Sequence, residues 1–191
     1  MRPSAAKDEA DESVCLCVLN TCAVTGKAEQ KARRVINLLL KKFPAAALVV
    51  TGCYAQLSGQ LIETLDPRVV CLAGKAKSAL SGVPALLDDL KNASAAELAF
   101  CLKDFFKEKN AAPQKTALEP FALSPRGFLA HSRASLKIQD GCDNACSYCA
   151  IRLARGKSVS IDAREALLRA VELEKAGQSE LVLTGVNIGQ Y

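Results

Sequence analysis

Apolar runs and helical repeats alternate along the first half of the chain. Three short apolar runs, each about as long as a buried strand, predict strands at 14–19, 48–51 and 69–73. Apolar residues that recur at helical spacing predict helices at 27–42, 57–65 and 78–90. This alternation is typical of a parallel sheet covered by helices on both faces.

The same alternation returns near the end of the chain. A strand at 135–139, an amphipathic helix at 163–176 and a strand at 181–184 are expected to form one βαβ unit. Between the two regions, the segment 92–127 contains three prolines and a charged stretch, with a helix expected at 95–108. We therefore expect a first domain at 1–91, a linker at 92–127 and a second domain at 128–191.

Composition narrows the functional classes. Half of the 191 residues are hydrophobic, which is enough for a packed core, and the net charge of +5 permits a nucleic-acid partner without arguing for one. No stretch of about 18 apolar residues occurs and the N-terminus lacks the apolar core of a secretory signal, so we expect a cytoplasmic protein without a membrane span. In a reducing compartment, nine cysteines favour metal ligands over disulfides. The single histidine, His131, excludes a site built from several histidines.

Two cysteines follow predicted strands of the first domain. Cys22 comes after the strand at 14–19, and Cys53 comes directly after the strand at 48–51 and Gly52. Because parallel strands end at the same edge of a sheet, where ligands bind, these two thiols could approach each other. We interpret the remaining cysteines of this half, Cys15, Cys17, Cys71 and Cys101, as structural thiols.

Three more cysteines lie close together after the strand at 135–139. Cys142, Cys146 and Cys149 have the spacing C-x3-C-x2-C, in a loop of small and polar residues. Thiolates bind iron–sulfur clusters, and three of them leave the fourth iron of a cubane open for a substrate or cofactor. A zinc site or chance clustering is the alternative, although the three-residue gap is unusual for zinc.

This motif, with Tyr148 before its last cysteine, resembles the signature of the radical S-adenosylmethionine (SAM) superfamily. Four blocks together resemble the methylthiotransferases within it: LNTCAVTGKAEQKARRVI (19–36), VVTGCYAQ (49–56), LKIQDGCDNACSYCAIRLARG (136–156) and LVLTGVNIGQY (181–191). The resemblance covers most of the chain except the connector.

The resemblance implies an α/β fold with two parts. The first is an N-terminal, Rossmann-like parallel-sheet domain that carries a second [4Fe–4S] cluster, for which Cys22 and Cys53 match two of three ligands. The third ligand of the family lies in an earlier strand–loop, before this sequence begins. The second part is the first βαβ unit of a radical SAM β/α barrel, truncated here, so the fragment alone is expected to be inactive.

The resemblance also implies a reaction and its cofactors. The open iron of the cluster on Cys142, Cys146 and Cys149 would bind SAM, whose cleavage gives a 5′-deoxyadenosyl radical. Tyr148 is expected against the adenine of SAM, with a core aromatic as the alternative. Thr184 and Gly185 are expected where the backbone meets the amino group of SAM, with a plain turn as the alternative.

The blocks resemble most closely the type that adds a methylthio group to C2 of N6-threonylcarbamoyladenosine at position 37 of ANN-decoding tRNA. An electron donor such as flavodoxin or ferredoxin is implied. Three alternatives stay open: a methylthiotransferase acting on isopentenyladenosine in tRNA, one acting on a ribosomal protein, and an inactive metal-binding fragment.

Overall fold

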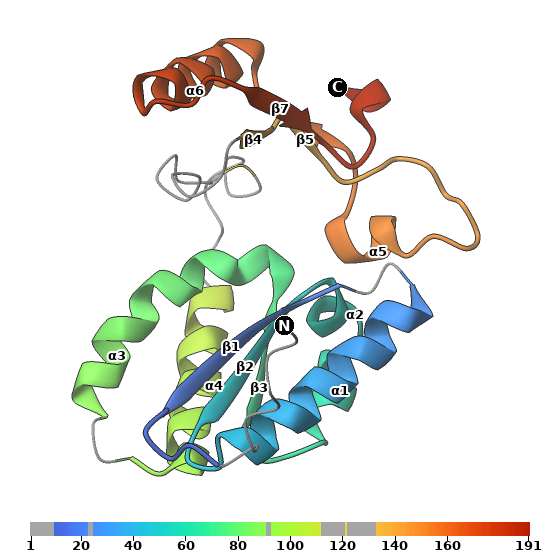
Figure 1. Ribbon diagram of the computed structural model, residues 1–191. Coiled ribbons are helices and arrows are strands. Elements are labelled where there is room, and N and C mark those ends of the chain that lie inside the picture. Colours follow the sequence, from blue (N-terminus) through green and yellow to red (C-terminus); the bar gives the residue numbers. More distant parts are fainter. Residues whose placement is uncertain (1–9, 23–24, 91–92, 112–120, 122–132) are drawn as a thin grey trace, which may run out of the picture. The chain divides into compact units, whose positions relative to one another are not determined.

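The computed structural model describes residues 10–22, 25–90, 93–111, 121 and 133–191 of the chain. Two compact units divide between Gln114 and Lys115 (Figure 1). None of the helices in these ranges combines the length and the apolar character needed to span a bilayer. His131 and residues 92, 112–120 and 122–127 of the segment expected to link the units lie outside the described residues.

The first unit is built on a three-stranded parallel sheet. Its strands are β1 (Leu16–Thr21), β2 (Ala47–Gly52) and β3 (Val69–Ala73), in the order β1-β2-β3. Every residue of β2 is buried, because this strand lies between the other two and both of its faces are covered. The predicted parallel α/β sheet is therefore confirmed.

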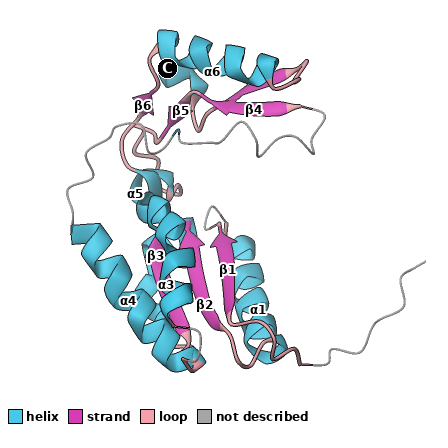
Figure 2. Cartoon of the chain, turned by 90° about the vertical axis from the view of Figure 1, so that its left-hand side faces the viewer, coloured by secondary structure: helices cyan, strands magenta, loops and turns pink. Residues whose placement is uncertain are grey.

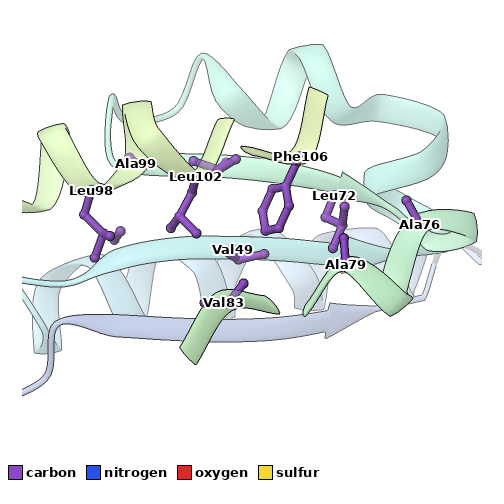
Figure 3. Packing of buried hydrophobic residues seen from close by; sticks show 11 residues of the cluster. Val49, Leu72, Ala76, Ala79, Val83, Leu98, Ala99, Leu102 and Phe106 are labelled. Atoms are coloured by element: carbon purple, nitrogen blue, oxygen red, sulfur yellow. The ribbon is translucent and has the colours of Figure 1, made fainter. Parts of the chain in front are cut away.

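Helices cover both faces of this sheet (Figure 2). On one face, α1 (Gly26–Lys42) and α2 (Cys53–Glu63) pack against Leu48 and Val50. On the other face, Val49 and Leu72 pack against side chains of η1 (Gly74–Gly82), α3 (Val83–Asp89) and α4 (Ala95–Ala111), as Figure 3 shows. Alternate residues of the strands thus serve two separate apolar cores.

Two helix predictions need correction. The helix expected at 57–65 begins at Cys53, and it is kinked at Ser58, whose φ of −132° is not helical. The helix expected at 78–90 is a 3₁₀ helix over Gly74–Gly82 followed by α3. The break falls beside Pro84, which fits only the first turn of an α-helix because it has no N–H to donate.

The helix α4 belongs to the first unit. Leu98, Leu102 and Phe106 are buried against the sheet. This helix lies in the segment 92–127 that was expected to link the domains. The apolar face of α4 explains why this helix packs on the sheet instead of serving as a linker. Such a face is stable when it is buried against other apolar residues and not when it is exposed to water.

The second unit contains the expected βαβ arrangement. The strand β4 (Ala134–Lys137) pairs in parallel with β7 (Leu181–Thr184), and α6 (Ala163–Lys175) lies between them in sequence. Leu136, Ile138 and Leu173 belong to the core that these elements share. Asp162 caps the start of this helix, because its carboxylate accepts hydrogen bonds from the backbone N–H groups of Arg164 and Glu165.

Several short elements of this unit were not predicted. The strand expected at 135–139 is divided into β4 and β5 (Gln139–Asp140), and β5 pairs in antiparallel fashion with β6 (Val159–Ser160). A short helix, α5 (Ile151–Arg155), follows the cysteine loop, and a 3₁₀ turn, η4 (Ile188–Gln190), follows β7. These elements are too short to leave a hydrophobic period in the sequence.

Candidate functional site

Cys22 and Cys53 follow paired positions of adjacent strands. Thr21 lies opposite Gly52 in the parallel register of β1 and β2, and each cysteine is the next residue of its strand segment. Cys22 is exposed, whereas Cys53 is half-buried as the first residue of α2. The structure therefore places both thiols at the carboxyl edge of the sheet, as the sequence predicted.

Gly52 allows the two strand ends to approach closely. Its φ is +97°, and a Cβ atom on this residue would lie 2.1 Å from the carbonyl oxygen of Thr21. The hydroxyl of Thr21 also donates a hydrogen bond of 2.6 Å to the carbonyl oxygen of Thr51. A glycine is thus required between β2 and Cys53, because any side chain there would push the strands apart.

A cation lies at the same edge of the sheet. The ammonium group of Lys77 donates a hydrogen bond of 2.8 Å to Oδ1 of Asn20, two positions before Cys22. The hydroxyl of Thr51 is fully buried and has no hydrogen-bond partner among the described residues. The edge that presents the two cysteines therefore also carries the positive charge of Lys77.

Cys71 differs from these two thiols. It lies inside β3, and burial raises the pKa of its thiol to about 12, with the nearby carboxylate of Glu63 adding to the effect. Such a thiol stays protonated at neutral pH, so its environment suits a structural residue rather than a metal ligand.

The other three cysteines lie on one loop of the second unit. Residues 141–150 have no regular secondary structure, and Cys142 and Cys149 are half-buried whereas Cys146 is exposed. The backbone N–H of Cys149 donates a hydrogen bond of 3.1 Å to the carbonyl oxygen of Cys146, which closes a turn between them. Within the ranges that the structure describes, no three cysteine, histidine or acidic side chains converge as a metal-binding group.

The loop begins at a second constrained glycine. Gly141 has a φ of +73°, and a Cβ atom there would lie 2.0 Å from the carbonyl oxygen of Lys157. The next residue, Cys142, donates its backbone N–H to the carbonyl oxygen of Gly156 at 3.2 Å. The two ends of the cysteine segment are thus held against each other at Gly141 and Gly156.

Asp140 anchors the loop through three donors. Its carboxylate accepts hydrogen bonds from Lys137 Nζ at 2.5 Å, from Arg155 Nη1 at 2.9 Å and from the backbone N–H of Gly141 at 2.9 Å. Burial alone would raise the pKa of Asp140, but the hydrogen bonds from Lys137 and Arg155 outweigh it and lower the pKa. Asp140 therefore stays ionised and connects the strand before the loop to the helix after it.

Tyr148 is 89% exposed. It stands beside Cys149 and does not pack into the core of the second unit as the structure describes it. An exposed aromatic ring next to the thiols offers a flat apolar surface to a ligand.

Thr184 ends β7 and Gly185 follows it. This turn meets a residue that the sequence did not single out. Gln139 is completely buried, and a Cβ atom on Gly185 would lie 3.0 Å from its Oε1 atom. The carbonyl oxygen of Thr184 accepts a hydrogen bond of 2.9 Å from the backbone N–H of Ile138. No signal in the sequence marked Gln139, because it continues the polar alternation of Ser135 and Lys137 along the strand.

Comparison with known proteins gives the relatives of the chain. Residues 2–74 match the family described as uncharacterized protein family UPF0004. The chain is 42% identical to a protein of Treponema pallidum (strain Nichols) named threonylcarbamoyladenosine tRNA methylthiotransferase MtaB, over 93% of this chain and 46% of that protein. It is 31% identical to a protein of the same name from Bacillus subtilis (strain 168), over 95% of this chain and 37% of that protein.

A relative of another name is less similar. The tRNA-2-methylthio-N(6)-dimethylallyladenosine synthase of Lawsonia intracellularis is 29% identical, over 94% of this chain and 38% of that protein. The chain thus spans less than half the length of these relatives. Alignment runs along nearly all of the chain, through both cysteine-bearing units, and so this chain belongs to the MiaB/MtaB-like methylthiotransferase family.

Proposed function

We propose that the chain is the cluster-binding part of a radical SAM tRNA methylthiotransferase. The observation that carries the proposal is the loop of Cys142, Cys146 and Cys149, which directly follows a strand in a chain similar to proteins named as tRNA methylthiotransferases. The reaction would add a methylthio group to C2 of N6-threonylcarbamoyladenosine at position 37 of tRNA.

The residues present fit an iron–sulfur cluster. Three thiols lie on one loop, all of them free of disulfides and none of them fully buried. Thiolate sulfur is the usual ligand of iron–sulfur clusters. When bound, a [4Fe–4S] cluster with one open iron supplies an electron and a coordination site for SAM.

The loop itself would do three things in this function. Cys142, Cys146 and Cys149 would hold the cluster. Tyr148, exposed beside the last cysteine, would cover one side of the SAM adenine. The ionised Asp140, bound to Lys137 and Arg155, would keep the loop in place while ligands enter and leave.

Thr184 and Gly185 would supply backbone at the amino group of SAM. They lie at the end of β7, beside β4, which leads into the cysteine loop. Ligands of parallel α/β sheets bind at the carboxyl ends of the strands. This position supports a role of the turn after β7 in cofactor binding.

Cys22 and Cys53 would hold a second [4Fe–4S] cluster, the site at which a sulfur is methylated by a second SAM molecule. Their placement after the paired residues Thr21 and Gly52 supports this assignment. We assign no third ligand among the described cysteines. Cys71 is half-buried inside β3, and the pKa of its thiol is raised to about 12.

The threonylcarbamoyl substrate is favoured by the higher identity to relatives named for it. A relative named for dimethylallyladenosine is less similar, and so methylthiolation of an isopentenylated adenosine is the second candidate. Further partners of the whole protein would be an ANN-decoding tRNA and a low-potential electron donor such as flavodoxin or ferredoxin.

Nucleoside analysis separates these substrates. Total tRNA nucleosides of a strain that lacks the gene would be compared by mass spectrometry with those of the parent and of a complemented strain. We expect 2-methylthio-N6-threonylcarbamoyladenosine to disappear and its unmethylthiolated precursor to accumulate. Loss of the methylthio-isopentenyl nucleoside instead would favour the second candidate, and unchanged levels of both would contradict a tRNA substrate.

A further inference from the structure

Residues of the turn after β7 form hydrogen bonds with the first half of the cysteine loop, although more than 40 positions separate the two segments in sequence. The backbone N–H of Asp143 donates to Oε1 of Gln190 at 3.1 Å. The side-chain amide of Gln190 in turn donates to Oδ1 of Asn144 at 3.3 Å. Nδ2 of Asn187 donates to the sulfur of Cys142 at 3.9 Å. Two of these contacts hold the loop, and the third reaches a proposed metal ligand.

Asn187 is held in place by the protein around it. Its backbone N–H and that of Val186 both donate to Oε1 of Gln139, each at 2.9 Å. Gln139 is completely buried. Its other amide atom, Nε2, donates to the carbonyl oxygen of Gly141 at 2.9 Å and to the hydroxyl of Ser158 at 2.8 Å.

The buried side chain of Gln139 therefore links Gly141, the residue before Cys142, to Asn187. Asn187 in turn donates to the sulfur of Cys142. The turn is also tightly packed, because a Cβ atom on Gly185 would meet Gln139 at 3.0 Å. An amide on such a turn loses little further conformational entropy when it donates its hydrogen bond, unlike a free side chain on the surface.

A hydrogen bond to a thiolate sulfur changes the chemistry of a cluster. The reduction potential depends on net charge and on hydrogen bonds to the sulfurs. An N–H donor stabilises the form that carries more negative charge, which is the reduced form, and so raises the potential. The amide of Asn187 stays neutral across the physiological pH range, so this effect would not vary with pH.

We propose that Asn187 is a positioning residue that donates a hydrogen bond from Nδ2 to the Cys142 thiolate and thereby raises the reduction potential of the cluster on the three-cysteine loop. The inference rests on the proposed function and deepens it. In the redox step concerned, the cluster takes up one electron from an external low-potential reductant. No bond is formed or broken.

The test is a potentiometric titration of the anaerobically reconstituted full chain, with the reduced cluster followed by electron paramagnetic resonance. Asn187→Leu removes the donor at similar volume, and we expect the equilibrium constant for reduction to fall about tenfold, which is about 59 mV for a one-electron couple. The matched control is Gln190→Leu, which removes contacts to Asp143 and Asn144 but none to sulfur. Its potential should equal that of the wild type. An unshifted Asn187→Leu, or equal shifts in both variants, would overturn the inference.

A second variant and a second measurement keep the test open if Asn187→Leu misfolds. Asn187→Asp keeps the shape but replaces the donor with an anionic oxygen, and it should lower the potential further. In the chain without iron, Cys142→Ala should move the side-chain amide signals of Asn187 in ¹⁵N-correlated nuclear magnetic resonance spectra. Signals that stay in place would contradict the proposed contact.

Failure of the proposed function gives a different result from failure of this inference. A wild-type chain that assembles no [4Fe–4S] cluster contradicts both. A chain that assembles the cluster and releases 5′-deoxyadenosine from SAM supports the proposed function. If its cluster reduction potential does not change when residue 187 is substituted, the inference alone is contradicted.

Discussion

Thr21 lies opposite Gly52 in the register of two parallel strands, and this pairing brings Cys22 and Cys53 to one edge of the sheet from positions 31 residues apart. The positive φ of Gly52 and the nearby carbonyl oxygen of Thr21 leave no space for a side chain. The geometry of this proposed cluster site thus depends on a residue that carries no functional group.

Gly52→Ala should therefore destabilise the first unit. A non-glycine residue at this φ costs about 1–3 kcal/mol, and the clash with Thr21 adds to that cost. Urea unfolding should show a clearly lower midpoint than the wild type. Gly26→Ala is the control, because a Cβ atom there meets nothing within 4 Å. Equal midpoints for both variants would contradict the close approach of the strands.

Ile36→Ala should show how much α1 contributes to the first unit. Ile36 is completely buried against the sheet, so its truncation leaves a cavity and should lower the free energy of unfolding by about 2–5 kcal/mol. Leu38 is 50% exposed on the same helix, and Leu38→Ala should change stability by less than about 0.5 kcal/mol. Chemical denaturation of the two variants and the wild type measures the free energies of unfolding to be compared. Similar losses would mean that α1 does not pack through the face seen here.

Asp140→Asn should weaken the second unit in a pH-dependent way. The folded-state pKa of Asp140 lies below its ordinary value of 3.8. Its ionised form therefore stabilises the fold above pH 3.8, and this contribution is lost as the pH falls through the lower folded-state pKa. We expect the variant to unfold at lower urea than the wild type at pH 7, with the difference shrinking below about pH 3.8.

The control for Asp140 is Glu180→Gln. Glu180 lies 3.6 Å from Arg133 in an exposed ion pair, and such pairs contribute little to stability. Its unfolding midpoint should stay near that of the wild type at both pH values. A stability difference for Asp140→Asn that does not change between pH 7 and pH 3 would show that charge is not its cause.

Gln139→Leu should disrupt the second unit strongly. The variant leaves the backbone N–H groups of Val186 and Asn187 without their acceptor. A fully buried unsatisfied group costs about 1–3 kcal/mol. Val186 and Asn187 are half-buried, so we expect a total loss of about 2 kcal/mol for the two groups. Thermal melts measure it, with the exposed Gln60→Leu as the control. A melting temperature of Gln139→Leu like that of the wild type would contradict the structural role that we assign to Gln139.

The sequence predicted the elements that carry a clear hydrophobic period and missed those held by distant contacts. The three parallel strands, α1, α4 and α6 all follow from runs or helical repeats that bury one face. In contrast, β5 and β6 have two residues each. Hydrogen bonds across the cysteine loop define them, and no local pattern encodes these bonds.

The candidate site shows the same division. The three-cysteine motif was visible in the sequence because its spacing is local, and the two strand-end cysteines were visible because each follows a short apolar run. Gln139 was not, since it alternates with Leu136 and Ile138 as an outward-facing residue of a strand would. It is buried because the turn at Gly185 and the segment at Ser158 fold over it, and contacts between such distant parts leave no mark in a single sequence.

The central claim is that Cys142, Cys146 and Cys149 hold a [4Fe–4S] cluster, and iron counting tests it most directly. The wild-type chain and an alanine variant at each of the three positions would be reconstituted anaerobically and their bound iron measured, with Cys101→Ala as the control. We predict that each of the three variants loses about four irons per chain, whereas Cys101→Ala keeps the wild-type content. Unchanged iron in any one of the three variants, or uptake of zinc in preference to iron by the wild type, would contradict the account.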